Sequence, residues 1–192
     1  SVGQKAINEK LEKYFCASPL NFRTIIMNLY FYYVDEKYID YLKKCECNKR
    51  GFTCVPNVNY GNTKKFTFGA VLSVNNVSYF VPVSFIQKTG RCYTHKKQEK
   101  PAILGSLRFT YMIPVPECCL KKVDIGSFES IKSKGHISEE LAFCRRNRDK
   151  IFKRAYKTYN RVIAGNNSIL MKNSCDYKLL EKAYNEYLCI IE

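Results

Sequence analysis

Runs of apolar and aromatic residues in the first two thirds of the chain predict β-strands. Leu29 to Val34 is rich in aromatic residues, and Phe66 to Val74 and Val77 to Ser84 are two apolar runs joined by Asn75-Asn76. Because asparagine tolerates positive φ, this dipeptide predicts a tight hairpin between the two runs. Ile103 to Val115 is a further strand-like run.

Apolar residues at helical spacing predict helices in other parts of the chain. Glu36 to Cys45 reads as a helix with Asp35 as its N-cap and Tyr38, Ile39 and Leu42 on its inner face. In the last third, steps of three and four residues predict one long helix that buries Leu141, Cys144, Ile151, Ala155, Tyr159 and Val162. After a Gly-Asn-Asn break at 165–167, Tyr177 to Ile191 predicts a final helix with Leu180, Tyr184, Tyr187 and Leu188 inward.

Strands in one half and helices in the other predict an α+β fold, a compact single domain with a mainly antiparallel sheet and long C-terminal helices. Glycine, proline and asparagine at 46–63 predict a loop, and 87–101 reads as a basic loop. We expect residues 27–192 to form the domain. Residues 1–26, with a short helix over 6–15, read as an N-terminal extension.

The charge balance favours a polyanionic partner. Lysine and arginine number 32 against 17 acidic residues, a formal net charge of +15. Cations that displace counterions from phosphates give sequence-independent affinity, so nucleic acid is the favoured partner class. The chain has no apolar run of the length that a membrane helix needs, so we expect a cytosolic protein without a membrane partner.

Ten cysteines raise the questions of disulfides and of zinc. A secreted disulfide fold is disfavoured, because the chain shows no signal peptide and is long enough to fold without cross-links. Cys45-x-Cys47 followed by Cys54 does not have the C-x-x-C spacing of zinc ribbons. We therefore expect reduced cysteines, no metal and no cofactor.

Four ordered stretches resemble the ToxN/AbiQ family of endoribonuclease toxins from type III toxin–antitoxin systems, and together they span residues 27–188. The first is Phe31 to Leu42, and the second is Phe68 to Leu72 with Tyr79 to Ser84. The third, Gly105 to Val115, carries the most distinctive pattern, Gly-x-Leu followed by Met-Ile-Pro. The fourth is Glu140 to Ile151 followed by Cys175 to Tyr184.

The resemblance implies a fold like that of other small ribonuclease toxins, with metal-independent cleavage of cellular or phage mRNA in bacteria. It also implies inhibition by a pseudoknotted antitoxin RNA made of short repeats, closed rings of protein and RNA, and roles in phage defence and plasmid maintenance. A metal-free ribonuclease turns the substrate's own 2′-hydroxyl onto phosphorus, which leaves a 2′,3′-cyclic phosphate and a 5′-hydroxyl. The protein must hold the nucleotide, move protons and neutralise charge on the phosphoryl oxygens.

The resemblance places the catalytic candidates at four positions. Ser84 stands where the family has a threonine or serine that can bond the scissile phosphate, with an ordinary strand-end serine as the alternative. Phe85-Ile-Gln-Lys88 then departs from the family's Ser-Pro-Lys. The family lysine falls on Gln87 by strict count or on Lys88 after a one-residue slip, and we favour Lys88 because only a cation stabilises a phosphorane.

Two more catalytic candidates follow from the same comparison. Lys65 precedes the Phe-Gly strand at a position where the family often has a cation, which predicts a phosphate ligand or proton donor; Lys64 beside it is a second candidate for RNA contact. Tyr38 falls on the family's helix tyrosine, so it either contacts RNA or packs in the core. If these assignments hold, Ser84, Lys65, Lys88 and Tyr38 line one basic groove.

Antitoxin RNA should contact a wider cationic surface. Arginine pairs with phosphate and stacks on unpaired bases, which suits RNA. The candidates for RNA binding are Arg91, Lys96 and Lys97 in the basic loop, Arg108 on the third predicted strand, and Arg145, Arg146 and Arg148 on the long helix. Two alternatives stay open, a non-catalytic RNA-binding relative of such toxins and a DNA-binding protein, although no DNA-binding motif is visible.

Overall fold

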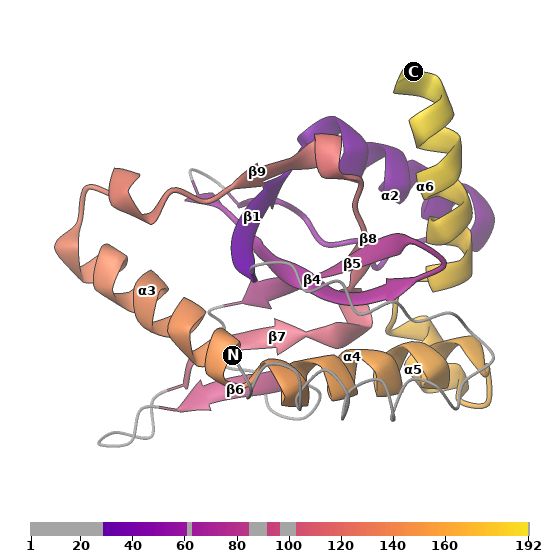
Figure 1. The fold of residues 1–192 in the computed structure, drawn as a ribbon. Helices are drawn as coiled ribbons and strands as arrows, with labels where there is room; N and C mark the ends of the chain where they lie inside the picture. The colour runs from indigo at the N-terminus through magenta and orange to yellow at the C-terminus, as the bar shows by residue number, and fades with distance from the viewer. Residues whose placement is uncertain (1–28, 61–62, 85–91, 97–102, 192) are drawn as a thin grey trace.

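Antiparallel strands form the centre of the computed structural model, which describes residues 29–60, 63–84, 92–96 and 103–191, with the backbone alone at 60, 63, 64, 92–96 and 103–105. Within these residues one sheet has the strand order β6 (Cys92–Lys96), β7 (Ile103–Arg108), β5 (Val77–Ser84), β4 (Thr67–Val74), β1 (Tyr30–Val34) and β9 (Leu120–Lys122). The short β8 (Ile113–Pro114) also pairs with β5. The antiparallel α+β prediction is confirmed (Figure 1).

The β4–β5 hairpin has the turn that its sequence predicts. Asn75 and Asn76 have φ values of 49° and 65°, and Val74 pairs with Val77 directly before and after them. Asparagine accepts this left-handed conformation at small cost, which explains the dipeptide. Gly69 on β4 lies directly under the ring of Phe80 on β5, where a Cβ atom would clash with that ring.

Helix α2 (Glu36–Arg50) begins as predicted but runs beyond Cys45, so the loop prediction for 46–50 is wrong. The Asp35 side chain accepts bonds from the backbone N–H groups of the first turn, and Gly51 at φ 74° ends the helix. Buried Glu46 explains the extra turn. Its carboxylate pairs with Arg50 at 2.9 Å and accepts bonds from the N–H groups of Cys54 and Asp176, so the turn is joined to the C-terminal helices.

Residues 52–64 also contain more structure than a loop. Their second half forms a small hairpin of β2 (Asn59–Tyr60) and β3 (Thr63–Lys64), apart from the main sheet. The backbone N–H of Lys65 donates to Val58 O at 2.7 Å. This bond fixes the entry into β4.

The long helix expected in the last third is two helices, α3 (Ile131–Arg146) and α4 (Arg148–Ile163), which separate at Asn147. The side-chain amide of Asn147 donates to Phe143 O at 2.9 Å, and asparagine often competes with helical bonding in this way. The apolar positions are nevertheless all buried, as predicted: Leu141, Cys144, Ile151, Ala155, Tyr159 and Val162. Hydrophobic spacing therefore gave the buried faces correctly and missed the break.

Two further predictions change in the structure. The basic loop at 87–101 contains β6, which pairs with β7. The strand expected over 103–115 is interrupted by the 3-10 turn η1 (Phe109–Tyr111), so that β7 and β8 are separate. Four further short elements were not predicted: strand β9, the turns η2 (Glu117–Cys119) and η3 (Ile125–Ser127) on either side of it, and helix α5 (Ser168–Lys172).

The C-terminal helix α6 (Tyr177–Ile191) has the expected bounds and packs against α2 and β8. Its Glu181 accepts hydrogen bonds from the hydroxyls of Tyr79 at 2.9 Å and Tyr159 at 2.5 Å, which ties β5 and α4 to it. None of the helices in the described ranges has the length and apolar character to cross a bilayer. The eight cysteines whose side chains the structure describes are unbridged.

Candidate active site

The ends of β4, β5 and β7 bring Lys65, Ser84 and Arg108 into one neighbourhood. The N–H of Val83 donates to Phe66 O at 3.1 Å, which places Ser84 and Lys65 each one residue from that bond. Val83 pairs with Leu107 and Ser84 with Ser106, so Arg108 follows on the neighbouring strand. All three side chains of this Lys65 cluster are half-buried. Sheet register therefore assembles two cations and a hydroxyl from separate parts of the chain.

The electrostatics of this cluster act on Lys65. Partial burial lowers the pKa of Lys65, and the positive charge of Arg108 lowers that pKa further. The Arg108 guanidinium lies over the ring of Tyr111, 4.3 Å from its centroid, which orients the cation. A lysine whose pKa is lowered gives up a proton more readily than an ordinary surface lysine, while Arg108 stays charged.

Lys65 also lines a hollow of about 370 Å³ beside β1 and β9. Its other lining residues include Tyr33 and Lys121, and the carboxylates of Asp35 and Glu36. Asp35 already caps α2, and Glu36 accepts a bond from the Asn59 amide at 2.6 Å. The hollow therefore joins two lysines with two acids that have other hydrogen-bond partners, and it extends the Lys65 cluster along the sheet edge.

Tyr38 lies away from this surface. Its side chain is 0% exposed, and its hydroxyl donates to Pro114 O at 2.7 Å. Its ring contacts that of Tyr187 on α6, with 4.8 Å between centroids. Burial raises the pKa of Tyr38 far above its ordinary value. This placement supports the core-packing alternative and removes Tyr38 from the residues that can touch a substrate.

Several other candidates have no described side chain. Lys88, Arg91 and Lys97 lie outside the described residues, and Lys64 and Lys96 belong to strands of which the backbone alone is described. Their roles therefore stay as predictions from the sequence.

The arginines of the helical region are spread over the junction of α3 and α4. Arg145 and Arg146 at the end of α3 are exposed, whereas Arg148 at the start of α4 is half-buried and 3.6 Å from the Asp149 carboxylate. Arg145 differs from its neighbours because its Nε donates to Leu29 O at 2.9 Å and its guanidinium lies over Tyr30. Of the three, Arg145 is held in a defined position against the sheet.

Sequence reasoning missed two residues of these surfaces and did not connect a third with Lys65. Arg108 was predicted to contact RNA, and its positive charge also acts on Lys65. Lys121 and Lys122 were not assigned at all, although they are adjacent lysines on β9 and line two different hollows. The available signal was an adjacent lysine pair within a short strand that was not recognised, and it points to these hollows only once β9 is placed at the sheet edge.

Comparisons with known proteins agree with this architecture. Residues 30–185 match the family model described as toxin ToxN, type III toxin–antitoxin system. The chain is 28% identical over 169 residues to endoribonuclease ToxN of Pectobacterium atrosepticum, which covers 82% of this chain and 92% of that protein. It is 26% identical over 170 residues to endoribonuclease AbiQ of Lactococcus lactis subsp. lactis, with 81% and 87% covered.

A solved structure shares the fold at a TM-score of 0.72 and 23% identity, over 84% of this chain and 98% of the other. It comes from work on bacterial type III toxin–antitoxin systems and selective toxin inhibition by a non-coding RNA pseudoknot. At this level of identity the likeness concerns the fold alone.

Proposed function

This chain belongs to the ToxN family of toxins from type III toxin–antitoxin systems, and from that membership we propose that it is an endoribonuclease that cuts RNA without a metal ion. Two curated relatives that cover most of its length are named endoribonucleases. We assign the activity to the domain spanning residues 27–192 and its substrates to cellular or phage mRNA in the bacterial cytoplasm.

The proposed reaction uses the ribose of the substrate as the nucleophile. The 2′-oxygen attacks the adjacent phosphorus as its proton passes to a water molecule. The bond from phosphorus to the 5′-oxygen breaks with its electron pair on that oxygen, which takes a proton from the Lys65 ammonium. The products are a 2′,3′-cyclic phosphate and a 5′-hydroxyl, so atoms and charge balance without a cofactor.

The other residues of the Lys65 cluster stabilise the negative charge that develops on the phosphoryl oxygens. Arg108 is oriented by Tyr111 and can pair with the non-bridging oxygens of the phosphorane. Ser84 at the end of β5 supplies a hydroxyl for the same phosphate. Lys88 follows four residues later in the chain, and we keep it as the cation that takes the family lysine's role.

The observation that carries this proposal is the pairing of Lys65 with Arg108. The positive charge of Arg108 acts on Lys65, and this repulsion accounts for part of the lowered pKa of Lys65. A phosphodiester relieves the repulsion, because its negative charge lies between the two. The arrangement is therefore suited to an anion whose charge increases along the reaction.

We further propose that a pseudoknotted antitoxin RNA made of short repeats covers this site and joins copies of the chain into a closed ring of protein and RNA. The solved structure with the same fold comes from work on inhibition by such a pseudoknot. The formal net charge of +15 supplies the long-range attraction that an RNA inhibitor requires.

A cleavage assay tests the proposal. The purified chain is incubated with end-labelled RNA in excess EDTA, and the products are examined for a 2′,3′-cyclic phosphate and a 5′-hydroxyl. We expect cleavage in EDTA, and a loss of at least 100-fold for Lys65→Ala, since proton transfer contributes roughly 10²–10⁴-fold.

The matched control is Lys182→Ala. This exposed lysine on α6 forms an ion pair with Glu186, so the variant removes the same charge away from the Lys65 cluster. Its cleavage rate should stay within twofold of the parent. If the chain binds RNA but does not cut it, the alternative of a non-catalytic RNA-binding relative of these toxins is correct. The departure from the family pattern at Phe85 to Gln87 would then explain the lost activity.

A further inference from the structure

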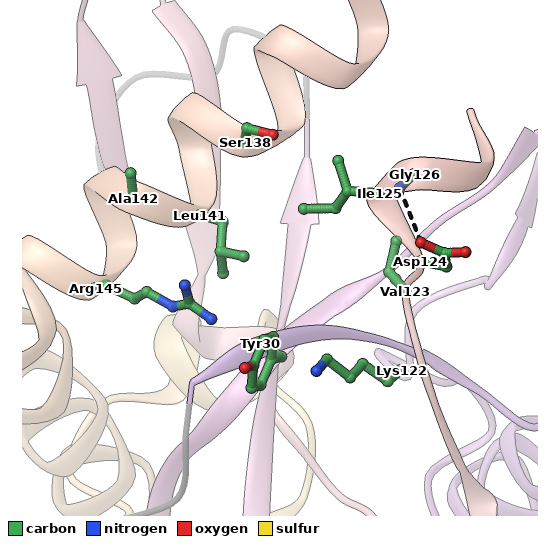
Figure 2. Close-up of a pocket in the computed structure, with 10 residues that line it drawn as sticks. All are labelled: Tyr30, Lys122, Val123, Asp124, Ile125, Gly126, Ser138, Leu141, Ala142 and Arg145. Atoms are coloured by element: carbon green, nitrogen blue, oxygen red, sulfur yellow. Dashed lines mark hydrogen bonds between the residues drawn. The ribbon is translucent and has the colours of Figure 1, made fainter. Parts of the chain in front are cut away.

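A second hollow lies beside the same two edge strands, β1 and β9 (Figure 2). Neighbouring residues of a strand point to opposite faces, so Lys121 lines the hollow of Lys65 and Lys122 lines this one. The second hollow has a volume of about 610 Å³ and is bounded by β1, β9, η3 and α3. We call it the Tyr30 pocket and define it by Tyr30, Lys122, Ile125, Ser138, Leu141 and Arg145.

Two cations are held against one aromatic ring at the base of the Tyr30 pocket. Lys122 Nζ lies 3.4 Å and Arg145 Cζ lies 4.5 Å from the centroid of Tyr30. The hydrogen bond that Arg145 Nε donates to Leu29 O fixes the position of the guanidinium. The pKa of the Tyr30 hydroxyl is lowered, first by Lys122 and then by the positive charge of Arg145. A phenol and two cations therefore converge from three separate elements.

The charges at this end of the pocket are not balanced by acids. Within the described part of the chain, the ion pairs include neither Lys122 nor Arg145. The acid in the pocket lining, Asp124, caps η3 by accepting the N–H of Gly126 at 2.9 Å. The base of the pocket thus carries a net positive charge and is suited to a phosphate.

The remaining walls suit a flat apolar group with a polar edge. Ile125 from η3 and Leu141 from α3 face each other across the hollow above Tyr30 (Figure 2). Ser138 on α3 supplies a hydroxyl at the far end, and the capping carboxylate of Asp124 lies on the η3 side. The volume lies in the range of about 300–1,000 Å³ that is usual for small-ligand sites.

We propose that the Tyr30 pocket binds one unpaired nucleotide of a bound RNA strand, with its phosphate at Lys122 and Arg145 and its base between Ile125 and Leu141. The inference rests on the proposed function, because it takes the partner to be RNA. Proteins recognise RNA mainly through unstacked nucleotides whose bases enter such pockets. An RNA strand that fills both hollows lies along β1 and β9, which border both of them.

A binding measurement on the full chain tests the pocket. The probe is a fluorescein-labelled, mixed-sequence 20-nucleotide RNA with every 2′-oxygen methylated, so that attack by a 2′-hydroxyl cannot cut it. We expect Lys122→Gln to weaken binding about tenfold and to lower the slope of log K against log salt by about 0.7, the amount for one phosphate contact on a single strand. Lys122 is exposed, so the substitution should leave the fold intact.

Two further arms separate the pocket from general charge effects. Lys182→Gln makes the same charge change on α6 and should change affinity less than twofold. Tyr30→Leu keeps the charge and removes the ring that holds both cations, and it should weaken binding about as much as Lys122→Gln. In the parent protein, photo-crosslinking with 5-iodouridine in the probe should map to Tyr30.

The outcomes are distinct for the two proposals. If the parent chain binds the probe but Lys122→Gln and Lys182→Gln bind equally well, the pocket is overturned and the proposed function stands. If the parent chain does not bind the probe at all, the RNA partner itself is wrong and both proposals fail.

Discussion

The two hollows beside the β1–β9 edge differ in how they hold their cations. In one hollow Lys65 is partly desolvated and feels the positive charge of Arg108, and both effects lower its pKa. In the other hollow Lys122 and Arg145 lie against the ring of Tyr30. Both hollows carry positive charge, but only the first makes a lysine a better proton donor.

This difference teaches how charge can be divided between chemistry and binding. A cation against an aromatic face is stabilised as a cation, whereas a cation beside another cation is inclined to lose its proton. The arrangement around Tyr30 therefore favours permanent contact with phosphate, and the arrangement of Lys65 and Arg108 favours proton transfer. The two hollows should therefore respond in opposite ways to matched substitutions.

The largest expected effect distinguishes the hollow of Lys65 from the Tyr30 pocket. Lys65→Ala should reduce the rate of RNA cleavage at least 100-fold while RNA affinity changes less than threefold, because one of many phosphate contacts is lost. Lys122→Gln should weaken affinity about tenfold. Single-turnover kinetics at saturating RNA, together with equilibrium binding, measures both quantities. If Lys65→Ala lost affinity and rate in the same proportion, Lys65 would be a binding residue only.

The next effect concerns the repulsion between the two cations of the Lys65 cluster. Arg108→Gln should reduce the cleavage rate about 10- to 100-fold through the lost pairing with phosphate. It should also move the alkaline limb of the pH–rate profile to higher pH. The protonated Lys65 is the active form, so the rate falls as pH rises through its pKa, and removing Arg108 raises that pKa. An unmoved limb would mean that Lys65 is not the titrating group.

A smaller effect is expected in α3, the helix that forms one wall of the Tyr30 pocket. Burial, and then the charge of Glu139, raises the pKa of Glu140 from 4.5 to about 7. Neither carboxylate oxygen has a hydrogen-bond partner within the described residues. The folded state therefore favours the protonated acid. The stability from this group is complete below pH 4.5 and is lost as pH rises through about 7.

Glu140→Gln should consequently be more stable than the parent by about 1–3 kcal/mol at pH 8 and nearly equal to it at pH 4. Urea unfolding at both values measures the difference, and the comparison with the parent cancels the other titrating groups. A gap between the two proteins that does not change with pH would show that Glu140 does not titrate in this range.

The smallest effect tests the placement of Tyr38. Tyr38→Phe loses the hydrogen bond to Pro114 O, so the free energy of unfolding should fall by about 1 kcal/mol. The cleavage rate should stay within twofold of the parent, because the ring is buried away from the Lys65 cluster. A large loss of rate at unchanged stability would return Tyr38 to the catalytic residues.

Local signals in the sequence predicted a large part of this fold. The Asn75-Asn76 turn, the Asp35 cap and the bounds of α6 are each determined by neighbouring residues, and all three were confirmed. The interruptions were not predicted. Asn147 divides a continuous apolar face, and η1 divides an apolar run, because side-chain and tertiary contacts there override periodicity.

The candidate site was less accessible to sequence reasoning, since the register of separate strands determines it. The most distinctive motif of the resemblance, Met112-Ile-Pro114, is core: Met112 and Ile113 are fully buried, and Pro114 O accepts the Tyr38 hydroxyl. The residues that can meet RNA lie beside such motifs. Arg108 and Lys122 can be assigned to the Lys65 cluster and the Tyr30 pocket only when the positions of β7 and β9 in the sheet are known.

The most direct test of the central claim alters the substrate and leaves the protein unchanged. Once a cleavage position is mapped in one RNA, the single 2′-hydroxyl on its 5′ side is replaced by hydrogen and the cleavage rate of the parent chain is measured in EDTA. We predict that cleavage at this position disappears while cleavage at other positions continues. Unchanged cleavage at the deoxy position would contradict attack by the ribose, and with it the role assigned to the Lys65 cluster.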